Sequence, residues 1–190
     1  MYPVSHPSAR LLLRELEAGD VDAVLGIYGS AEATRHLSFE PRSREQVEQI
    51  VGRSIGSARA RPRTEYALAV CVRQGGELVG FARLADDPHQ QRAVTMGFAL
   101  RPDAWGRGYG TETVAALLAF SFGPLGLHRV WAARSPLNTA SEKILLRAGM
   151  TEEGRIRQHV HVRGAWRDSL VHAITEDEWN NRPAGTGASG

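Results

Sequence analysis

Trp105-Gly-Arg-Gly-Tyr-Gly110 leads directly into Thr111, Glu112 and an apolar run with helical spacing. This segment predicts a glycine-rich turn that opens a helix. The first backbone N–H groups of a helix have no partner within it, and the helix dipole adds a positive field there. Glycine lets a phosphate approach these groups and permits a positive φ, so the turn is a candidate phosphate-binding site with Arg107 as a cation at its rim. The alternative is a plain turn before a helix.

The strands and helices around this turn define the fold class. A helix is expected over residues 111–122, between strands at 94–100 and 129–134. Upstream we expect a strand at 9–16, helices beginning after Asp20 and Ser43, and strands at 66–72 and 77–84 joined by a hairpin at 74–76. Downstream we expect a helix that begins at Asn138 and ends at Gly149, then strands at 155–162 and 166–174 around a turn at 163–165.

The resulting order is β-α-α-β-β-β-α-β-α-β-β. Hairpin connections imply antiparallel pairing, whereas the strand–helix–strand unit over residues 94–134 implies one parallel pair with a right-handed crossover. The sequence therefore predicts an α/β protein of the α+β type, with a mixed, mostly antiparallel sheet and helices on both of its faces. The same order argues against a dinucleotide-binding oxidoreductase, as does Thr111 at the place of that motif's third glycine.

The composition limits the partners. A length of 190 residues and a 42% hydrophobic fraction suit one domain, expected over residues 1–180, followed by a disordered Gly-rich tail at 181–190. The net charge is only +2 and there is no polybasic tract, so no nucleic-acid partner is expected. The sequence shows neither a membrane-spanning segment nor a signal-peptide pattern, so we expect a cytoplasmic protein with no membrane partner. A homodimer through pairing of end strands is left open.

Several motifs follow one another along the chain. They are the strand at 94–100, the glycine turn, the strand at 130–134, the segments Asn138-Thr-Ala-Ser141 and Arg147-Ala-Gly-Met150, and the late element Gly164-Ala-Trp166-Arg-Asp168. In this order and spacing they resemble the GNAT acyltransferase superfamily, and within it the branch of ribosomal-protein N-terminal acetyltransferases. The resemblance covers residues 9–180 and implies a splayed central strand pair, made by the strands at 94–100 and 128–134.

The resemblance implies that acetyl-CoA is the cosubstrate and that an amine attacks its thioester directly, with no covalent acyl-enzyme. The implied cofactor-binding residues are Phe98, Ala99, Leu100, Trp105, Gly106, Arg107, Gly108, Tyr109, Gly110, Thr111, Asn138 and Ser141. Two of them are candidate catalytic residues: a backbone N–H near Phe98 as donor to the oxyanion, and Ser141 as proton donor to the thiolate. The alternative for Asn138 and Ser141 is a simple helix cap. No metal is implied.

The chain departs from the family pattern where a general base and an acid often stand. Thr95 replaces a glutamate and Leu145 replaces a tyrosine. Without a base, the enzyme needs an amine that is already partly neutral. At pH 7 about one in ten α-amino groups is neutral, against roughly one in a few thousand lysines. We therefore expect an α-amine to be preferred over a lysine side chain.

Histidines and one glutamate elsewhere offer other chemistry. His36, Glu40 and His161 are candidate bases, although ordinary loop polarity accounts for each of them singly. A zinc site made by His159, His161 and His172 is conceivable, but histidines on a solvated strand face are the better interpretation, and no metal is predicted.

Two functions remain. The first is an N-acetyltransferase that acts on a primary amine, either a protein or peptide N-terminus or a small amine such as an antibiotic. The alternative is an acyl-CoA-binding module with the same fold and little or no catalysis. Thr95 and Leu145 favour the module, whereas Asn138, Ser141 and the intact glycine turn favour the enzyme.

Overall fold

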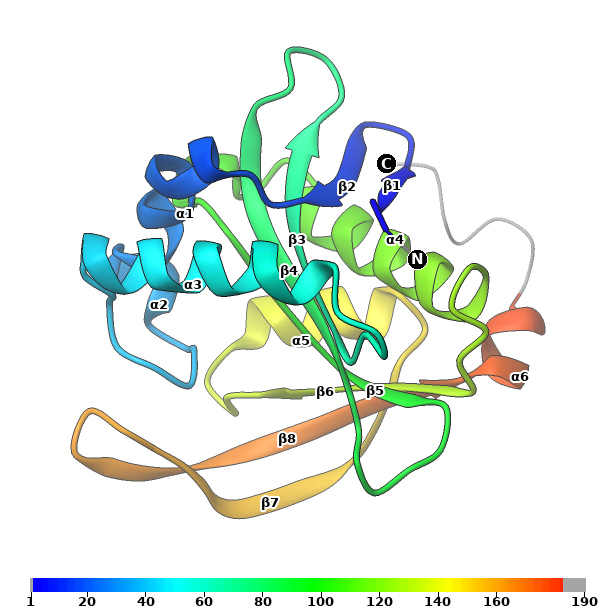
Figure 1. The fold of residues 1–190 in the computed structure, drawn as a ribbon. Coiled ribbons are helices and arrows are strands. Elements are labelled where there is room, and N and C mark those ends of the chain that lie inside the picture. The colour runs from blue at the N-terminus through cyan, green and yellow to red at the C-terminus, as the bar shows by residue number, and fades with distance from the viewer. Residues whose placement is uncertain (1, 183–190) are drawn as a thin grey trace.

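An eight-stranded sheet runs through the computed structural model, which describes residues 2–182, in the order β1-β2-β3-β4-β5-β6-β8-β7 (Figure 1). The strands are β1 (Ser5–Pro7), β2 (Leu11–Glu15), β3 (Glu65–Val72), β4 (Leu78–Asp86), β5 (Ala93–Leu100), β6 (Arg129–Arg134), β7 (Thr151–Val162) and β8 (Ala165–Thr175). Among the strands of the described residues, only β5 and β6 pair in parallel. The predicted mixed, mostly antiparallel sheet is confirmed.

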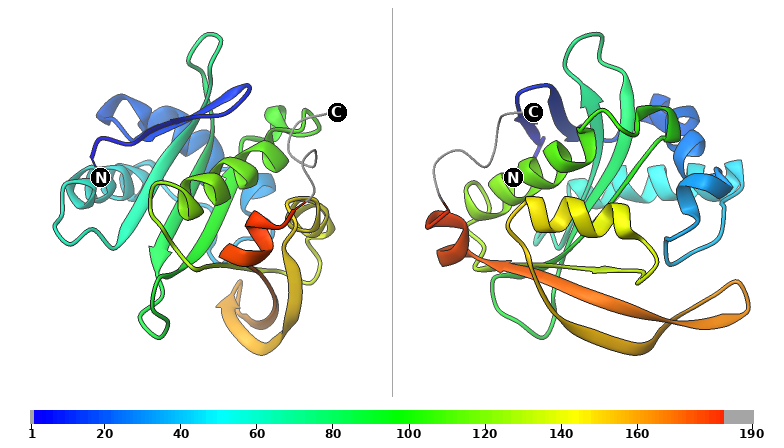
Figure 2. Two further views of the ribbon diagram at one scale, coloured as in Figure 1. Left: turned by 90° about the vertical axis from the view of Figure 1, so that its right-hand side faces the viewer. Right: turned by 180° about the vertical axis from the view of Figure 1, so that it is seen from behind.

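Helices cover both faces of this sheet, as predicted. They are α1 (Val21–Tyr28), α2 (Ala31–Thr34), α3 (Arg44–Ala58), α4 (Tyr109–Phe122), α5 (Thr139–Arg147) and α6 (Glu176–Asn180). Figure 2 shows α1 and α3 on one side of the sheet and α4 on the other. Side chains alternate between the faces of a strand. Ala67 and Ala69 of β3 accordingly pack with the α1–α3 layer, and Leu68 packs with the α4 layer.

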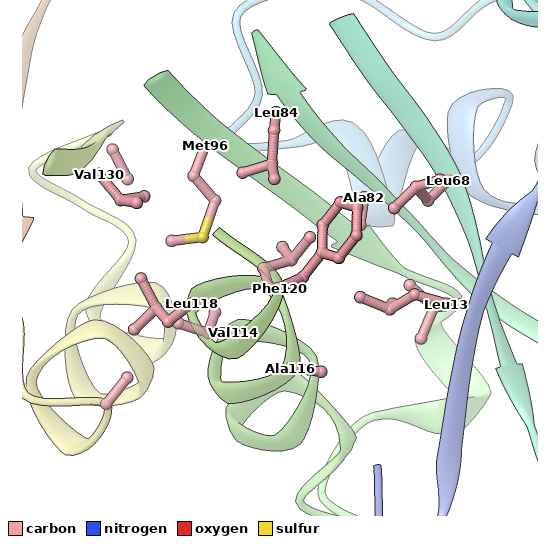
Figure 3. Packing of buried hydrophobic residues seen from close by; sticks show 14 of the residues in the cluster. Leu13, Leu68, Ala82, Leu84, Met96, Val114, Ala116, Leu118, Phe120 and Val130 are labelled. Carbon is pink, nitrogen blue, oxygen red and sulfur yellow. The ribbon is translucent and has the colours of Figure 1, made fainter. Parts of the chain in front are cut away.

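The larger core lies between α4 and the sheet. Figure 3 shows Phe120 of α4 turned toward Leu13, Leu68 and Ala82 on the strands, and Leu118 on the side of Met96 and Val130. Leu13, Leu68, Leu84 and Leu118 have no exposed surface and Phe120 has 1%. Burial of side chains of this size contributes about 1.5–3 kcal/mol each. At the other end of α4, Gly110 lies close to Ile144 of α5 and Leu100 of β5, so the start of α4 is placed beside the end of β5.

At two of three helix ends, the local sequence is sufficient to predict the observed cap. Ser43 begins α3 through a capping box with Gln46, as its position predicts. Gly149 follows α5 with φ +88°, the left-handed conformation expected of a helix-ending glycine. Asp20 does precede α1, but its carboxylate does not cap that helix. It accepts from the Glu17 N–H and binds Arg14 in a bidentate pair, with contacts of 2.7 and 2.8 Å.

The predicted splay between the central strands is present. β5 and β6 pair only where Ala93, Val94 and Thr95 face residues 129–131, and the two strands then diverge. β5 stays paired with β4 as far as Leu100. A gap therefore opens between the second half of β5 and the second half of β6.

Five short elements of the described residues do not appear in the sequence-based prediction: β1, α2, α6 and two 3₁₀ helices at Ala18–Asp20 and Pro102–Ala104. β7 also begins at Thr151 rather than at residue 155. The disordered tail predicted over residues 181–190 lies, from residue 183 on, outside the described residues. No helix in the described part of the chain is long and apolar enough to cross a membrane.

Candidate active site

The glycine turn adopts the conformation that its sequence predicts. Gly106 and Gly108 have φ values of +74° and +77°, a region that side chains other than glycine rarely adopt. Helix α4 begins at Tyr109, immediately after the turn. Among the described residues, no acceptor is found for the backbone N–H groups of residues 107–111. A row of free donors thus lies at the positive end of a helix dipole.

Glu112 fixes this turn to the start of the chain. Its carboxylate accepts from the Ser8 hydroxyl (2.7 Å), from the Arg10 N–H (2.6 Å) and from the Leu11 N–H (3.2 Å). The Arg10 guanidinium binds the same carboxylate (2.7 Å) and also donates to the Arg107 C=O (3.0 Å). Burial raises the pKa of Glu112, but these hydrogen bonds outweigh burial and hold it below its usual value. Glu112 is therefore a brace for the turn.

A cavity of about 520 Å³ borders the turn. Its walls come from the turn, the end of β5, the start of α5 and the segment around α2. The predicted cofactor-binding residues that line it are Phe98, Ala99, Leu100, Trp105, Gly106, Gly108, Tyr109, Gly110, Thr111, Asn138 and Ser141. Of the predicted set only Arg107 does not line it. The first cavity thus brings together residues from three separate segments.

A second cavity, of about 470 Å³, lies between the diverging strands. Its walls include residues 95–99 of β5 and residues 131–134 of β6. Phe98 and Ser141 line both cavities, as do Asn138 and His36. The two cavities therefore adjoin at Phe98 and Ser141, the two candidate catalytic residues.

The backbone of β5 directs donor and acceptor groups into the gap. Arg101 N–H donates to Val79 C=O (2.9 Å), which marks this pair as hydrogen-bonded across β4 and β5. Bonded and non-bonded pairs alternate in an antiparallel ladder, so Phe98 and Leu100 turn their backbone groups away from β4. The Leu100 C=O accepts from the Trp105 indole (3.0 Å). The N–H and C=O of Phe98 face the gap, where β6 has already diverged.

Asn138 and Ser141 occupy the start of α5. The Asn138 side-chain oxygen accepts from the Ser141 N–H (3.0 Å), so the capping role considered for Asn138 is confirmed. Ser141 is half-buried and lines both cavities. Leu145, one turn later, is 1% exposed and borders the second cavity with an apolar side chain. Ser141 is thus the hydroxyl of this helix at the junction of the cavities.

Thr95 and His36 both reach the second cavity. The Thr95 hydroxyl donates to the Ala85 C=O (3.3 Å) within the sheet. Burial lowers the pKa of His36, and the nearby charges of Arg35 and Arg167 lower it further. A neutral imidazole is therefore the form of His36 at pH 7, and it is the candidate base that the fold brings to the site.

The other two candidate bases lie outside both cavities. Glu40 accepts a hydrogen bond from the Arg163 N–H (3.2 Å). The His161 ring packs against Trp166, with ring centroids 5.2 Å apart. Trp166 itself is 62% exposed and lines neither cavity. These residues belong to the hairpin and to the loop beside it.

The histidines considered for zinc do not gather. His159 bonds Ser169 (Nδ1 to Oγ, 3.0 Å), whereas His172 is fully buried opposite Glu152. Residues 2–182 contain no group of three or more His, Cys, Asp or Glu side chains placed to hold a metal ion. His159 lines the second cavity, a position that the sequence could not predict because the pairing of β7 with β8 is irregular between Ile156 and Val160.

Aromatic and aliphatic side chains line much of the second cavity. Trp131 lines this cavity and is held by a hydrogen bond from its indole N–H to Asp87 (2.9 Å). The other apolar members include Tyr28, Phe39, Phe81, Met96 and Leu145. The cavity therefore suits an organic molecule of modest size.

Comparisons with known proteins agree with this geometry. The acetyltransferase (GNAT) domain model matches residues 10–151. The uncharacterized N-acetyltransferase YoaA of Bacillus subtilis (strain 168) is 26% identical over 177 residues, which cover 93% of this chain and 98% of YoaA. The ribosomal protein uS5-alanine N-acetyltransferase of Escherichia coli (strain K12) is 26% identical over 104 residues, covering 54% of each protein. The structure of Mycobacterium smegmatis RimJ with CoA-disulfide has a TM-score of 0.79 at 26% identity, covering 93% of this chain and 90% of RimJ.

Proposed function

The chain belongs to the GNAT family of acetyltransferases, and from this membership we propose that it transfers an acetyl group from acetyl-CoA directly to a primary amine in the gap between β5 and β6. Enzymes of this family use acetyl-CoA, and the RimJ structure contains a form of CoA. The observation that carries the proposal is the junction of two cavities at Phe98 and Ser141. The first cavity borders a phosphate-binding turn, and the second is open to an acceptor.

The lining of the first cavity fits acetyl-CoA. The free N–H groups of residues 107–111 suit a pyrophosphate, because they lie at the positive end of α4. The Phe98 N–H and C=O suit the amide groups of the pantetheine arm. Acetyl-CoA supplies the acetyl carbonyl and the thiol that departs.

Two groups of the chain then act on the reacting atoms. The Phe98 N–H donates a hydrogen bond to the oxygen that gains negative charge, which is the role of an oxyanion hole. The Ser141 hydroxyl donates its proton to the departing sulfur as the carbon–sulfur bond breaks, and the proton that the attacking nitrogen loses restores the hydroxyl. Asn138 holds Ser141 in place, because it caps the helix turn on which Ser141 lies.

The acceptor is an amine that is already partly neutral. Thr95 cannot accept a proton at neutral pH, and the described residues place no carboxylate on the second cavity. His36 lines the cavity, but its lowered pKa makes it too weak a base to deprotonate a lysine ammonium group. About one in ten α-amino groups is neutral at pH 7, whereas an unperturbed lysine would lose about 4–5 kcal/mol to deprotonation. The site therefore favours an α-amine over a lysine side chain.

The test is thiol release from acetyl-CoA by the purified protein with a panel of α-amines and lysine side-chain amines. We expect release that depends on the amine and is faster with α-amines. Binding of acetyl-CoA without release in the presence of any amine would instead indicate an acyl-CoA-binding module. Much faster acetylation of lysine side chains would contradict the preference for α-amines.

A further inference from the structure

We propose that the acceptor is a small primary amine that also carries an anionic group, as an amino acid does, and that Arg167 binds this anion. The inference rests on the proposed acetyl transfer and names its substrate class. It starts from the charges that line the second cavity. Arginine and histidine side chains line it, namely Arg83, Arg134, Arg167, His36 and His159, and no aspartate or glutamate of residues 2–182 does so. A polyamine would find no counter-ion there for its second ammonium group.

Two of these arginines already have carboxylate partners. Arg83 is bound to Glu65 (2.5 Å). Arg134, which is 5% exposed, is bound to Glu142 and lies 3.3 Å from Glu152. Their charges are largely balanced by the protein itself.

Arg167 differs, because no carboxylate of the described residues forms an ion pair with it. Its guanidinium donates to the backbone C=O groups of His36 (2.9 Å) and Leu37 (3.2 Å), and its Nε is buried without a partner. Burial lowers the pKa of Arg167 and the neighbouring charge of Arg163 lowers it further, but a guanidinium stays protonated at neutral pH. A half-buried cation without a counter-ion is costly, and a bound carboxylate would offset that cost through charge-assisted hydrogen bonds.

The surroundings of Arg167 favour a small acceptor. The β7–β8 hairpin is tied to the segment after α2, and the two lie side by side in Figure 1. Besides the Arg167 contacts, the Arg163 guanidinium donates to the Thr34 C=O (3.1 Å) and the Arg163 N–H donates to Glu40 (3.2 Å). These bonds hold the hairpin against the segment whose residues 36–39 line the second cavity, which has a volume of about 470 Å³. An amino acid fits a space of this size.

The position of Arg167 leaves the reacting end of the acceptor free. Arg167 and Ser169 lie two residues apart on β8, and both line the cavity. Side chains at this spacing share a face and stand about 7 Å apart along the strand. An anion held at Arg167 leaves the amine to extend toward Phe98 and Ser141, where the two cavities adjoin.

The experiment compares the common L-amino acids with their amides in the acetyl transfer assay, with spermidine and an alanyl peptide as further acceptors. In solution the free carboxylate raises the pKa of the neighbouring amine, so an amide is intrinsically the more reactive acceptor at pH 7, whereas a carboxylate paired with Arg167 would no longer favour the protonated amine. We expect the opposite order here, with kcat/KM at least about tenfold higher for the best amino acid than for its amide.

Variants of Arg167 test whether this residue causes the preference for amino acids over their amides. Arg167→Gln should raise KM for the amino acid about 10–100-fold and change KM for the amide little, and Arg167→Lys should retain part of the preference. The matched control is Arg157→Gln, an exposed arginine on the same hairpin, which should leave the ratio unchanged. If Arg167 only anchored the loop, its loss would affect acid and amide equally and leave their ratio unchanged.

Three outcomes overturn the inference: equal rates with acids and amides, a preference for spermidine, and transfer to the peptide alone. Such results would leave the proposed acetyl transfer intact. Absence of transfer to every amine, with acetyl-CoA still bound, would instead overturn the proposed function and this inference with it.

Discussion

Ser141 is the residue on which the chemical step depends. Its hydroxyl lies where the two cavities adjoin, and its backbone is fixed by Asn138. We predict that Ser141→Ala lowers kcat by on the order of 10²-fold, because the departing sulfur loses its proton donor. KM for acetyl-CoA should change little, since the cap and the glycine turn are intact. Steady-state kinetics check both values.

The control for Ser141→Ala is Ser54→Ala, which removes a half-buried helix hydroxyl that bonds the Ile50 C=O on α3, outside both cavities. This variant should keep the kcat of the wild type. If Ser141→Ala also kept it, Ser141 would be a residue of the helix start with no part in proton transfer.

Residues of the first cavity could be predicted from the sequence, but most of those that shape the second could not. Asn138 and Ser141 stand at a recognisable helix start, and the turn carries its own glycine pattern. Arg167 and His159 carry no local signal. They reach the site because β8 lies beside β6 and β7 lies outside it, an order that requires knowledge of long-range pairing.

Among the structural elements, the glycine turn requires a residue without a Cβ at position 108, and a single substitution tests this requirement. Gly108 has φ +77°, and a Cβ there would lie 3.1 Å from the Arg10 guanidinium. We predict that Gly108→Ala raises KM for acetyl-CoA about tenfold, because the turn must relax and its N–H groups move. The strain should also lower the free energy of unfolding by about 1–2 kcal/mol. Kinetics and denaturant titration measure the two effects.

Gly75→Ala is the matched control for this variant. Gly75 lies in the β3–β4 hairpin with φ +90° and open space around its Cβ position. Its replacement introduces similar backbone strain far from the cavities, so stability should fall while KM for acetyl-CoA stays the same. An equal rise of KM in both variants would show that the turn has no particular part in binding.

Glu112 connects α4 with the beginning of β2, so its replacement should affect both the stability of the protein and the binding of acetyl-CoA at the glycine turn. We predict that Glu112→Gln lowers the free energy of unfolding by about 1–2 kcal/mol, after allowance for the exposed side of Arg10, and raises KM for acetyl-CoA. Asp22→Asn removes a surface partner of Arg44 and should change neither quantity appreciably. Wild-type stability and KM in Glu112→Gln would contradict the role of a brace.

At the scale of the whole molecule, stability should depend on pH through His172. This side chain is fully buried, and burial together with the charge of Arg134 lowers its pKa in the folded state. The unfolded chain therefore binds a proton near pH 6.5 that the folded chain does not. Stability from this group is complete above that pH and falls as the pH decreases, by at most about 1.4 kcal/mol per pH unit.

Denaturant titrations between pH 7.5 and 5 test this dependence. The wild type should lose stability toward pH 5, and His172→Gln should show a shallower slope even if its stability at pH 7.5 is lower. His161→Gln, at an exposed position on the hairpin, should keep the wild-type slope. Identical slopes in wild type and His172→Gln would rule out His172 as the origin.

The overall architecture could be predicted from the order of strands and helices along the sequence. One strand–helix–strand unit among hairpins predicts one parallel pair in an otherwise antiparallel sheet, and this is confirmed for β5 and β6. β1, α2 and α6 could not be predicted, because segments of three to five residues form only with tertiary support. The bridge between the hairpin and the segment after α2 likewise joins residues more than a hundred positions apart.

Calorimetric titration of the folded protein with acetyl-CoA tests most directly whether the glycine turn and the adjoining gap form one binding site. The account predicts one bound acetyl-CoA per chain, with affinity weakened about tenfold by Gly108→Ala and unchanged by Gly75→Ala. No detectable association of acetyl-CoA with the well-folded wild type, or equal affinity in all three proteins, would contradict it.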